Sequence, residues 1–304
     1  MNNNTKDLTT IITDYKTISQ TINYIKELYK SADYLFDTIV VDNSLNFNSK
    51  IKFDKAFEYI KSTRISDWNC YQYKFENSWI ILVYSNKNNG YAGGNNIGAN
   101  IANKLFEPQY LLFSNSDIEL NKGFSIKKNI QFLKNHPSIG ILGPTIKDLN
   151  GKDQNPRKQM SAKSQLIYWY FDLMWFHMKF NQWNLDKNAH SKKAFWVSGS
   201  FMFVRNKAFI ECNGFDEHNF LYGEEIILSS RMRQKKYSTY YLEQIPIIHA
   251  HQGGTNSTFK NRRQNHKSIK YYYRKYENTP RYILVISDLS FYLVELVSYL
   301  KHHI

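Results

Sequence analysis

Cysteine and proline are scarce in this 304-residue sequence, which contains two cysteines and six prolines. Cys70 and Cys212 are too few and too far apart for a disulfide framework or a cysteine zinc site, so we expect two reduced, buried thiols. The N-terminus, MNNNTKDLTT, is polar and lacks the apolar segment of a signal peptide, so we expect a cytoplasmic protein. Internal repeats are absent, and so is a GxGxxG fingerprint after the first expected strand.

Acidic residues are in the minority: 26 Asp and Glu stand against 40 Lys and Arg, which gives a net charge of +14. Such an excess favours an anionic partner, and nucleic acid, an acidic membrane surface and a phosphate-bearing substrate all satisfy it. Hydrophobic residues make up 42% of the chain and aromatic residues 16%, which excludes a wholly disordered chain. Length and composition are typical of one large or two smaller globular domains.

The first half of the chain alternates strand-like and helix-like segments, a pattern typical of a parallel sheet covered by helices. We expect strands at residues 8–13, 36–41, 79–84, 110–113, 139–144 and 245–248. Helices are expected at 18–30, 95–105 and 123–135, and from about residue 223. The predicted fold class is therefore α/β, with a mostly parallel central sheet and helices on both of its faces.

We expect residues 259–304 to form a separate C-terminal helical tail, which starts with a basic stretch and contains an apolar segment at 282–300. The apolar segment approaches the about 20 residues of a membrane span. It also contains Asp288 and Glu295, which argue against a span. We expect a terminal helix that packs on the body, or on a second copy in a homodimer, and favour this over docking on a membrane surface.

Three polar clusters follow apolar strands, at the position where an open α/β sheet binds its ligands. They are Asp42-Asn43-Ser44, the Asn- and Gly-rich loop at 88–98, and Asn115-Ser116-Asp117. Glycines in the loop permit close backbone approach, and the N-terminus of the following helix favours negative charge. Asp117 offers the oxygen ligand that Mg²⁺ and Mn²⁺ prefer. Each cluster taken alone is equally explained as a turn or a helix cap.

Two further clusters carry titratable groups. Glu224 and Glu225 begin an expected helix, where the helix dipole favours carboxylates, so ordinary capping explains one of them. The pair also suits a general base that takes a proton from a hydroxyl. His249 and His251 end an apolar strand and point to one face while the strand continues, so either is a candidate metal ligand or diphosphate contact.

Taken in order, these segments resemble the family 2 glycosyltransferases, and in particular the rhamnosyltransferase-like branch that builds bacterial surface polysaccharides. The matching segments span residues 8–258 and read IVVDNS, NNGYAGGNNIGA, LLFSNSD, WVSGSFMFVR, GFDEHNFLYGEEIILSSR and IIHAHQGG. The resemblance implies a GT-A-like nucleotide-diphospho-sugar transferase fold. It also implies a catalytic domain at 1–258, with a nucleotide-binding half at 1–118 and an acceptor half at 119–258.

The same resemblance implies roles for individual residues. The donor nucleotide would be bound by Thr13, Asp42, Asn43, Asn88, Gly90, Gly94, Asn115, Ser116 and Asp117. The acceptor and sugar pocket would be shaped by Trp196, Gly199, Arg157 and Arg231. Asp117, with His249 or His251, would bind Mg²⁺ or Mn²⁺. Glu225 is the implied catalytic base, and Glu224 is its rival.

Three departures from the family pattern bear on these roles. Asn115 stands where the family's DxD-type element starts with Asp, a replacement that is common in this branch. Glu225 stands where the family usually has Asp, and its side chain is one methylene longer. The first strand ends Thr13-Asp14-Tyr15 where the family tends to show Thr-Tyr-Asn, so we expect different contacts with the nucleotide base of the donor.

The implied activity is inverting transfer of a sugar from a UDP- or dTDP-sugar to a hydroxyl of a cell-surface polysaccharide or a lipid-linked oligosaccharide. Basic residues would face the lipid-diphosphate acceptor or the inner face of the bacterial plasma membrane: Arg157, Lys158, Lys260, Arg262 and Arg263. Two rival interpretations are a catalytically degenerate partner subunit of the same fold and a nucleic-acid-binding protein, suggested by IKYYYRKYE. Because the sequence contains no recognised nucleic-acid-binding module, we favour the transferase.

Overall fold

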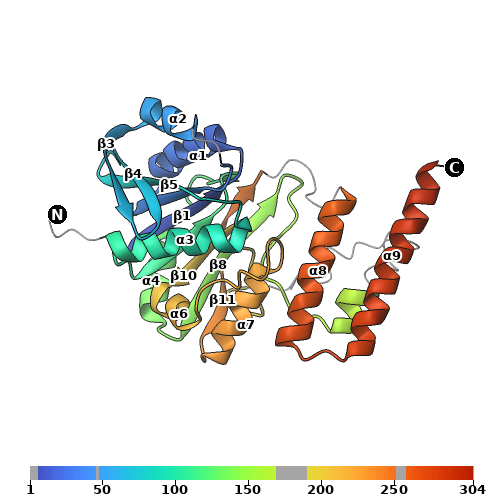
Figure 1. Cartoon of the computed structure of the whole chain (residues 1–304). Coiled ribbons are helices and arrows are strands. Elements are labelled where there is room, and N and C mark those ends of the chain that lie inside the picture. The colour runs from blue at the N-terminus through green and yellow to red at the C-terminus, as the bar shows by residue number, and fades with distance from the viewer. Residues whose placement is uncertain (1–5, 46–47, 169–189, 251–257, 304) are drawn as a thin grey trace.

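A computed structural model describes residues 6–45, 48–168, 190–250 and 258–303 as an α/β body followed by two long helices (Figure 1). The strands of the body are β1 (Leu8–Asp14), β2 (Asp37–Asp42), β3 (Glu58–Ile65), β4 (Trp68–Phe75), β5 (Ser78–Tyr84), β6 (Tyr110–Ser114), β7 (Ile118–Glu119), β8 (Ile139–Asp148), β9 (Lys192–Ala194), β10 (Phe201–Arg205) and β11 (Ser238–His249). Its helices are α1 (Ile18–Ser31), α2 (Asn48–Ala56), α3 (Gly90–Leu105), α4 (Ile126–Asn135), α6 (Asn206–Glu211) and α7 (Glu224–Gln234). A short π-helix, η1 (Ser164–Tyr168), lies against the two C-terminal helices.

One mixed sheet runs through the body in the order β3-β4-β5-β2-β1-β6-β10-β8-β11-β7, and β9 pairs with β11. Strands β5, β2, β1 and β6 are parallel to one another, as the alternation of strands and helices predicts. The pair β8–β11 is also parallel, whereas β3, β4, β10, β7 and β9 pair antiparallel with their neighbours. The expected mostly parallel sheet is therefore limited to these two groups of strands.

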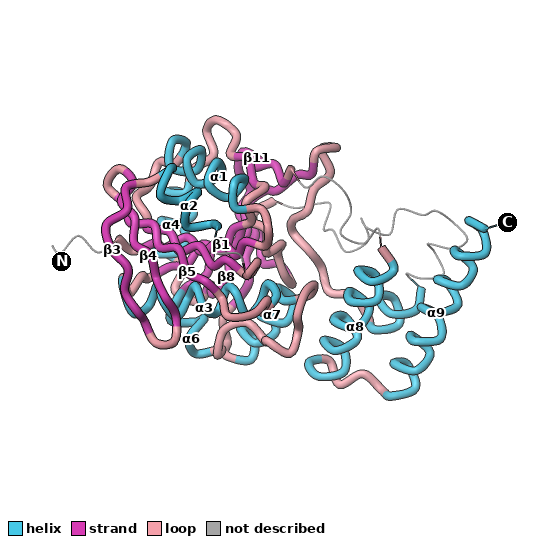
Figure 2. Tube along the Cα trace, turned by 45° about the horizontal axis from the view of Figure 1, so that its top comes forward, coloured by secondary structure: helices cyan, strands magenta, loops and turns pink. Residues whose placement is uncertain are grey.

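Helices cover both faces of the sheet, and each face has its own hydrophobic core (Figures 1 and 2). Helices α1, α2 and α4 pack on the face to which Ile12 and Val40 point. Helices α3, α6 and α7 pack on the opposite face, to which Ile11 and Ile39 point. Because side chains alternate along a strand, a strand covered on both faces appears in the sequence as a continuous apolar run.

Several elements were not expected from the sequence. Strands β3 and β4 form an antiparallel hairpin, and α2 precedes them. Most side chains of β3 are exposed, so this strand has no buried face to produce an alternating apolar pattern. Helix α3 begins at Gly90 instead of near residue 95, although glycine has a low helix propensity. The expected burial of Cys70 and Cys212 is confirmed.

The two long helices, α8 (Phe259–Tyr276) and α9 (Arg281–His303), form a helical hairpin that projects from the body (Figures 1 and 2). Helix α8 lies nearer the body, and α9 lies farther out. The expected helical tail at 259–304 consists of two helices: the apolar segment at 282–300 lies in α9, and the basic, tyrosine-rich stretch forms α8. By length and composition, Arg281–Leu300 is the one described segment that could cross a membrane, and 33% of its apolar window is buried.

Helix α9 has two different faces. Its inner face is buried and includes Ile283, Leu284, Ser287, Ser290, Phe291 and Val294. The opposite side, called the outer face below, carries apolar and aromatic side chains that are 42–67% exposed: Tyr282, Val285, Ile286, Leu289, Tyr292, Leu293, Leu296, Tyr299 and Leu300. An apolar stripe of this kind is uncommon on the surface of a water-soluble helix.

Candidate active site

The carboxyl ends of β1 and β2 form the first part of the candidate site. Asp42 is fully buried, and its carboxylate accepts hydrogen bonds from Ser44 N at 2.7 Å and from Ser49 Oγ at 2.5 Å. These bonds form an Asx-type turn between β2 and α2. Asp14, beside it on β1, accepts from two threonines at the start of α1, and burial raises the pKa of this carboxyl. Asp42 therefore shapes the loop after β2, and its contact with a nucleotide base stays a prediction.

The glycine-rich loop packs directly against these strand ends because it lacks side chains there. A Cβ added at Gly94 would lie 2.4 Å from Thr13 Cγ2 and 2.9 Å from Asn43 Nδ2. Gly90 has a φ of +66°, and a Cβ there would lie 2.0 Å from the carbonyl oxygen of Phe220. Asn43 Nδ2 also donates to the Gly90 carbonyl at 2.9 Å. The start of α3 is thus in contact with β1, β2 and the segment that precedes α7.

Two side chains of the loop extend these contacts. Asn88 Oδ1 accepts from the Gly90 N–H at 3.0 Å. The Tyr91 hydroxyl donates to the Gly199 carbonyl at 2.7 Å, and burial raises the pKa of Tyr91, so that this hydroxyl keeps its proton. Tyr91 was not among the predicted site residues, although the motif NNGYAGG contains it. It connects the glycine loop to the segment that precedes β10.

Asp117 follows β6 and lies beside His249, at the end of β11. His249 Nε2 is 3.2 Å from Asp117 Oδ1, and the Ala250 N–H donates to the Asp117 carbonyl at 2.7 Å. Gln154 Oε1 lies 3.0 Å from His249 Nδ1, a contact that fixes the orientation of the ring. His251 lies outside the described residues, so only His249 can be placed. Strand β7, which directly follows Asp117, pairs with β11, and this pairing brings one carboxylate and one imidazole together.

Metal binding here would need ligands beyond these two side chains. In the described part of the chain, no group of three or more His, Cys, Asp and Glu side chains could hold a metal ion. A cavity of about 460 Å³ opens on the α1 side of the loop and is lined by Ser116, Asp117, Glu27 and Glu119, among others. Its three carboxylates disfavour an anionic ligand, so a diphosphate is not expected on that side of Asp117.

Glu225 lies in the first turn of α7 and faces the segment that precedes β10. Its Oε1 accepts from the Gly199 N–H at 3.1 Å. A Cβ added at Gly199 would lie 2.7 Å from Glu225 Cγ, so glycine permits this close approach. Burial raises the pKa of Glu225 above the usual range of a carboxyl, while the Gly199 N–H and the positive charge of Arg157 lower it. The Arg157 guanidinium lies 5.5 Å from the ring centroid of Trp196.

Glu224 has a different environment from its neighbour. Its side chain is buried, and Glu224 Oε1 has no hydrogen-bond partner. Burial and the adjacent charge of Glu225 raise the pKa of Glu224 well above its usual range. A general base must carry a negative charge, and Glu225 has the Gly199 N–H and the positive charge of Arg157 to stabilise that charge, so the surroundings favour Glu225 over Glu224 as the base.

Residues 196–200 connect the two parts of the site. At one end, the Asn115 N–H donates to the Ser200 carbonyl at 2.8 Å, which ties this segment to the loop of Asp117. At the other end, the Gly199 N–H donates a hydrogen bond to Glu225 Oε1. Residues 154–157 run beside this segment and contact both His249, through Gln154, and Trp196, through the backbone of Arg157. Side chains from distant parts of the sequence thus lie along one continuous network.

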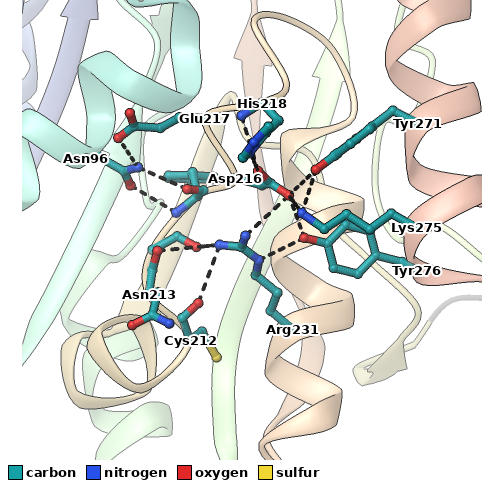
Figure 3. Close-up of polar contacts among 12 residues, drawn as sticks. Asn96, Cys212, Asn213, Asp216, Glu217, His218, Arg231, Tyr271, Lys275 and Tyr276 are labelled. Atoms are coloured by element: carbon teal, nitrogen blue, oxygen red, sulfur yellow. Dashed lines mark hydrogen bonds and ion pairs between the residues drawn. The ribbon is translucent and has the colours of Figure 1, made fainter.

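Arg231 belongs to a different network, which is centred on Asp216 (Figure 3). Its guanidinium donates to the Gly214 carbonyl at 2.9 Å and to Tyr276 Oη at 3.0 Å, and it lies 3.3 Å from Asp216 Oδ2. The N–H groups of the Arg231 guanidinium thus already have partners within the protein, and the bond to Tyr276 joins α7 to α8. Its predicted place in the acceptor pocket is therefore corrected. Asp216 is part of the motif GFDEHNF, but the sequence did not indicate its partners.

Comparison with known proteins identifies the family. Residues 88–270, more than half of the chain, match the family described as Glycosyltransferase like family 2. The chain belongs to this family. The match includes the glycine loop, Asp117, Glu225 and His249, and it confirms the resemblance inferred from the sequence.

Two relatives of this family 2 glycosyltransferase have established names. It is 26% identical over 152 residues to the N-acetylglucosaminyl-diphospho-decaprenol L-rhamnosyltransferase of Mycobacterium tuberculosis, a match that covers 48% of each chain. It is 24% identical over 243 residues to the low-salt glycan biosynthesis hexosyltransferase Agl10 of Haloferax volcanii, which covers 80% of this chain and 67% of the relative. The chain thus spans about half the length of the M. tuberculosis relative.

Solved structures of other glycosyltransferases share the fold. The structure of GalNAc-T7 with UDP, GalNAc and Mn²⁺ has a TM-score of 0.58 at 12% identity, and covers 91% of this chain and 50% of that one. The mannosyltransferase PcManGT of Pyrobaculum calidifontis, in complex with GDP-Man and Mn²⁺, has a TM-score of 0.55 at 10% identity, and covers 97% and 74%. The GT-A-like α/β fold predicted from the sequence is confirmed.

Proposed function

We propose that this glycosyltransferase moves a sugar from a UDP- or dTDP-sugar to a hydroxyl of a lipid-linked oligosaccharide or a growing cell-surface polysaccharide, with inversion at the anomeric carbon. The observation that carries the proposal is the hydrogen-bonded network from the loop of Asp117, through residues 196–200, to Glu225. Nucleoside diphosphates with Mn²⁺ in the two solved structures, and the lipid diphosphate in the name of the M. tuberculosis relative, support it.

The donor diphosphate would lie between the glycine loop and Asp117. The N-terminus of α3 offers backbone N–H groups and a partial positive charge to a phosphate. Asp117 and His249 would hold Mg²⁺ or Mn²⁺, since two ligands of one such ion lie about 3 Å apart, close to the separation observed between their ligating atoms. When bound, the ion offsets the negative charge that accumulates on the leaving diphosphate.

In the transfer step, the proton and the electron pairs move as follows. Glu225 takes the proton of the acceptor hydroxyl, whose oxygen forms a bond with the anomeric carbon. The bond from that carbon to the diphosphate oxygen breaks, and its electron pair leaves with the nucleoside diphosphate. Because the acceptor attacks from the face opposite the leaving group, the anomeric configuration inverts. The charge of Arg157 acts on Glu225, and the Arg157 guanidinium lies over the Trp196 ring, so these two residues would border the acceptor.

The matched variants Glu225→Gln and Glu224→Gln test this proposal. A thermal-shift screen of nucleotide sugars with Mn²⁺ first identifies the donor, because a ligand that binds only the folded state raises Tm. We expect Glu225→Gln to lower acceptor-dependent release of nucleoside diphosphate by about a thousandfold, within the range for loss of a general base, with donor Kd unchanged. Glu224→Gln replaces a buried side chain by one of similar shape and should retain turnover. Turnover by Glu225→Gln would remove this residue from the mechanism.

A further inference from the structure

The outer face of α9 is a continuous apolar surface. Its residues recur at intervals of three and four from Tyr282 to Leu300, so they occupy one side of the helix over about 27 Å. Both acidic residues of α9 lie off this face and pair with α8: Asp288 with His266 at 3.0 Å and with Lys270, and Glu295 with Arg262 at 2.6 Å. The nine residues of the outer face thus include no charged side chain, and the exposed Arg281 flanks them at the start of α9.

The charge of the helical hairpin is strongly positive. Residues 258–304 contain nine Lys and Arg residues against three Asp and Glu, a net charge of +6. Besides the two paired acids of α9, the third acid, Glu277, accepts from the Tyr272 hydroxyl at 2.5 Å. Four exposed basic residues recur along one side of α8, at intervals of three, four and seven: Lys260, Arg263, Lys267 and Arg274. An apolar face thus occurs together with exposed cations and internally paired acids.

We propose that the outer face of α9 lies in an anionic lipid surface, with the helix parallel to the membrane plane. Lipid acyl chains would cover the leucines and valine, and the tyrosines at 282, 292 and 299 suit the boundary between acyl chains and headgroups. The basic residues of α8 would attract anionic headgroups. A second copy fits this face less well, because pairing would bring two hairpins of charge +6 together.

A lipid-surface position also fits better than a membrane-spanning one. A spanning α9 would carry Asp288, Glu295 and the α8 cations paired with them into the hydrocarbon, where ionised groups are costly. The helix in the membrane plane keeps these pairs above the acyl chains, on the side that faces α8.

The contacts between α8 and α7 would transmit this orientation to the catalytic site. Asp216 accepts from Tyr271 and Tyr276 of α8 at 2.8 and 2.6 Å, and it lies 3.3 Å from Arg231 of α7 (Figure 3). Since α7 begins with the two glutamates, docking of α9 would hold Glu225 at a fixed orientation to the bilayer. This consequence rests on the proposed function with a lipid-linked acceptor; the membrane contact itself does not.

Vesicle flotation of the full chain tests the contact without any sugar substrate. The vesicles contain phosphatidylcholine alone or with one third phosphatidylglycerol. We expect binding to the anionic vesicles, and a fall of about a hundredfold in the partition coefficient for Leu289→Glu/Leu293→Glu, since burying each leucine favours binding by roughly tenfold or more. Leu149→Glu, at an exposed leucine in the body, is the matched control and should bind as the wild type does.

Three outcomes would overturn the proposal. The first is a wild-type chain that does not float with anionic vesicles. The second is a double variant that binds as tightly as the wild type. The third is a dimer in sedimentation velocity that Leu289→Glu/Leu293→Glu converts to a monomer, which would assign the outer face to a second copy. Donor Kd of the same variants, measured by calorimetry, separates the two proposals. If the proposed function is correct and the membrane contact is not, these variants still bind the donor with the wild-type Kd.

Discussion

Two adjacent glutamates show how local environment separates identical side chains. Glu225 accepts a backbone hydrogen bond and lies near a guanidinium, whereas Glu224 is buried and Glu224 Oε1 has no partner. The sequence predicts both as candidates because capping and catalysis favour acids at the same position. Only the approach of Gly199 and Arg157, which lie 26 and 68 positions away from Glu225 in the sequence, distinguishes them.

The charge of Arg157 gives a prediction for the pH dependence of transfer. Glu225 acts as a base only when ionised, so activity falls as the pH drops through its pKa, which burial raises and Arg157 lowers. Arg157→Gln removes the positive charge, so the acidic limb of the kcat/KM profile should move to higher pH. Arg157→Lys keeps the charge but not the planar guanidinium over the Trp196 ring, so the acidic limb of its kcat/KM profile should stay near that of the wild type. Identical limbs in all three enzymes would exclude the charge of Arg157 as the cause.

Donor binding should depend on Asp117 and a divalent metal. We expect Asp117→Ala to weaken metal-dependent donor affinity by about a hundredfold, because it removes the carboxylate ligand. Gln154→Ala, which removes only the group that orients His249, should weaken it by about tenfold. Isothermal titration calorimetry with and without Mn²⁺ measures both values. An Asp117→Ala chain with the wild-type, metal-independent affinity would show that this loop binds no metal.

The sequence predicts which residues gather at the site more fully than it predicts what they do there. Parallel strands carry their carboxyl ends to one edge, which is why Asp42 and Asp117 could be placed from the pattern alone. Arg231 could not be placed, because the basic residue i+6 from Glu225 has no periodic signature that separates a pocket from a packing contact. Tyr91 was missed for a similar reason: its partner, the Gly199 carbonyl, is 108 positions away.

At the scale of elements, the pattern of apolar residues predicts strands whose two faces are both buried, and it does not predict strands whose faces are both exposed. The apolar runs of β2, β5 and β6 give continuous burial, so these strands were predicted within one or two residues. Strand β3 is almost wholly exposed and is held by its pairing with β4, a contact that the sequence of β3 does not encode. Helix α8 lies within the expected helical tail, but its bounds were not predicted, because its buried residues include His266, Tyr272 and Tyr273, which do not form a simple apolar stripe.

The Asp216 network should contribute to the stability of the packing between α7 and α8. The Asp216 carboxylate is 2% exposed, and although burial opposes it, hydrogen bonds from Tyr276, Tyr271 and Lys275 hold its pKa well below the usual range. Asp216→Asn should lower the free energy of unfolding by about 2 kcal/mol at pH 7, a value reduced for the partial exposure of Lys275 and Arg231.

The sign of the pH dependence follows from the lowered pKa. The stabilisation by Asp216 is fully present above the pKa of the unfolded carboxyl, about 4, and is lost as the pH falls towards the lower pKa of the folded state. Urea unfolding at pH 7 and at pH 3.5 should therefore give a smaller difference between wild type and Asp216→Asn at the lower pH. Glu217→Gln, at the exposed neighbouring residue, is the control and should change stability by less than about 0.5 kcal/mol. A constant difference at both pH values would show that the charge of Asp216 is not responsible.

At the scale of the whole molecule, the positive charge is divided unevenly between the body and the helical hairpin. Of the net charge of +14, +6 lies in residues 258–304 and +8 in the much longer remainder. The sequence alone gave the total and left open whether the anionic partner is a substrate or a surface. The structure separates the two regions: the glycine loop and Asp117 lie in the body, whereas α8, which carries the exposed basic residues, projects from the body with α9 (Figure 1).

Charge reversal on α8 should therefore affect lipid binding and leave donor binding unchanged. Arg263→Glu/Lys267→Glu changes two exposed residues outside the Asp216 network and lowers the charge of the hairpin from +6 to +2. We expect binding to vesicles with one third phosphatidylglycerol to fall by about thirtyfold or more, because each basic residue near an anionic surface contributes about 1 kcal/mol. Donor Kd, measured by calorimetry with Mn²⁺, should stay within about twofold, since exposed charges separated by more than the Debye length of about 10 Å are largely screened at 0.1 M salt. Equal losses of vesicle and donor binding would instead mean that the charge of the hairpin affects both ligands, so that lipid binding and donor binding do not belong to separate regions of the molecule.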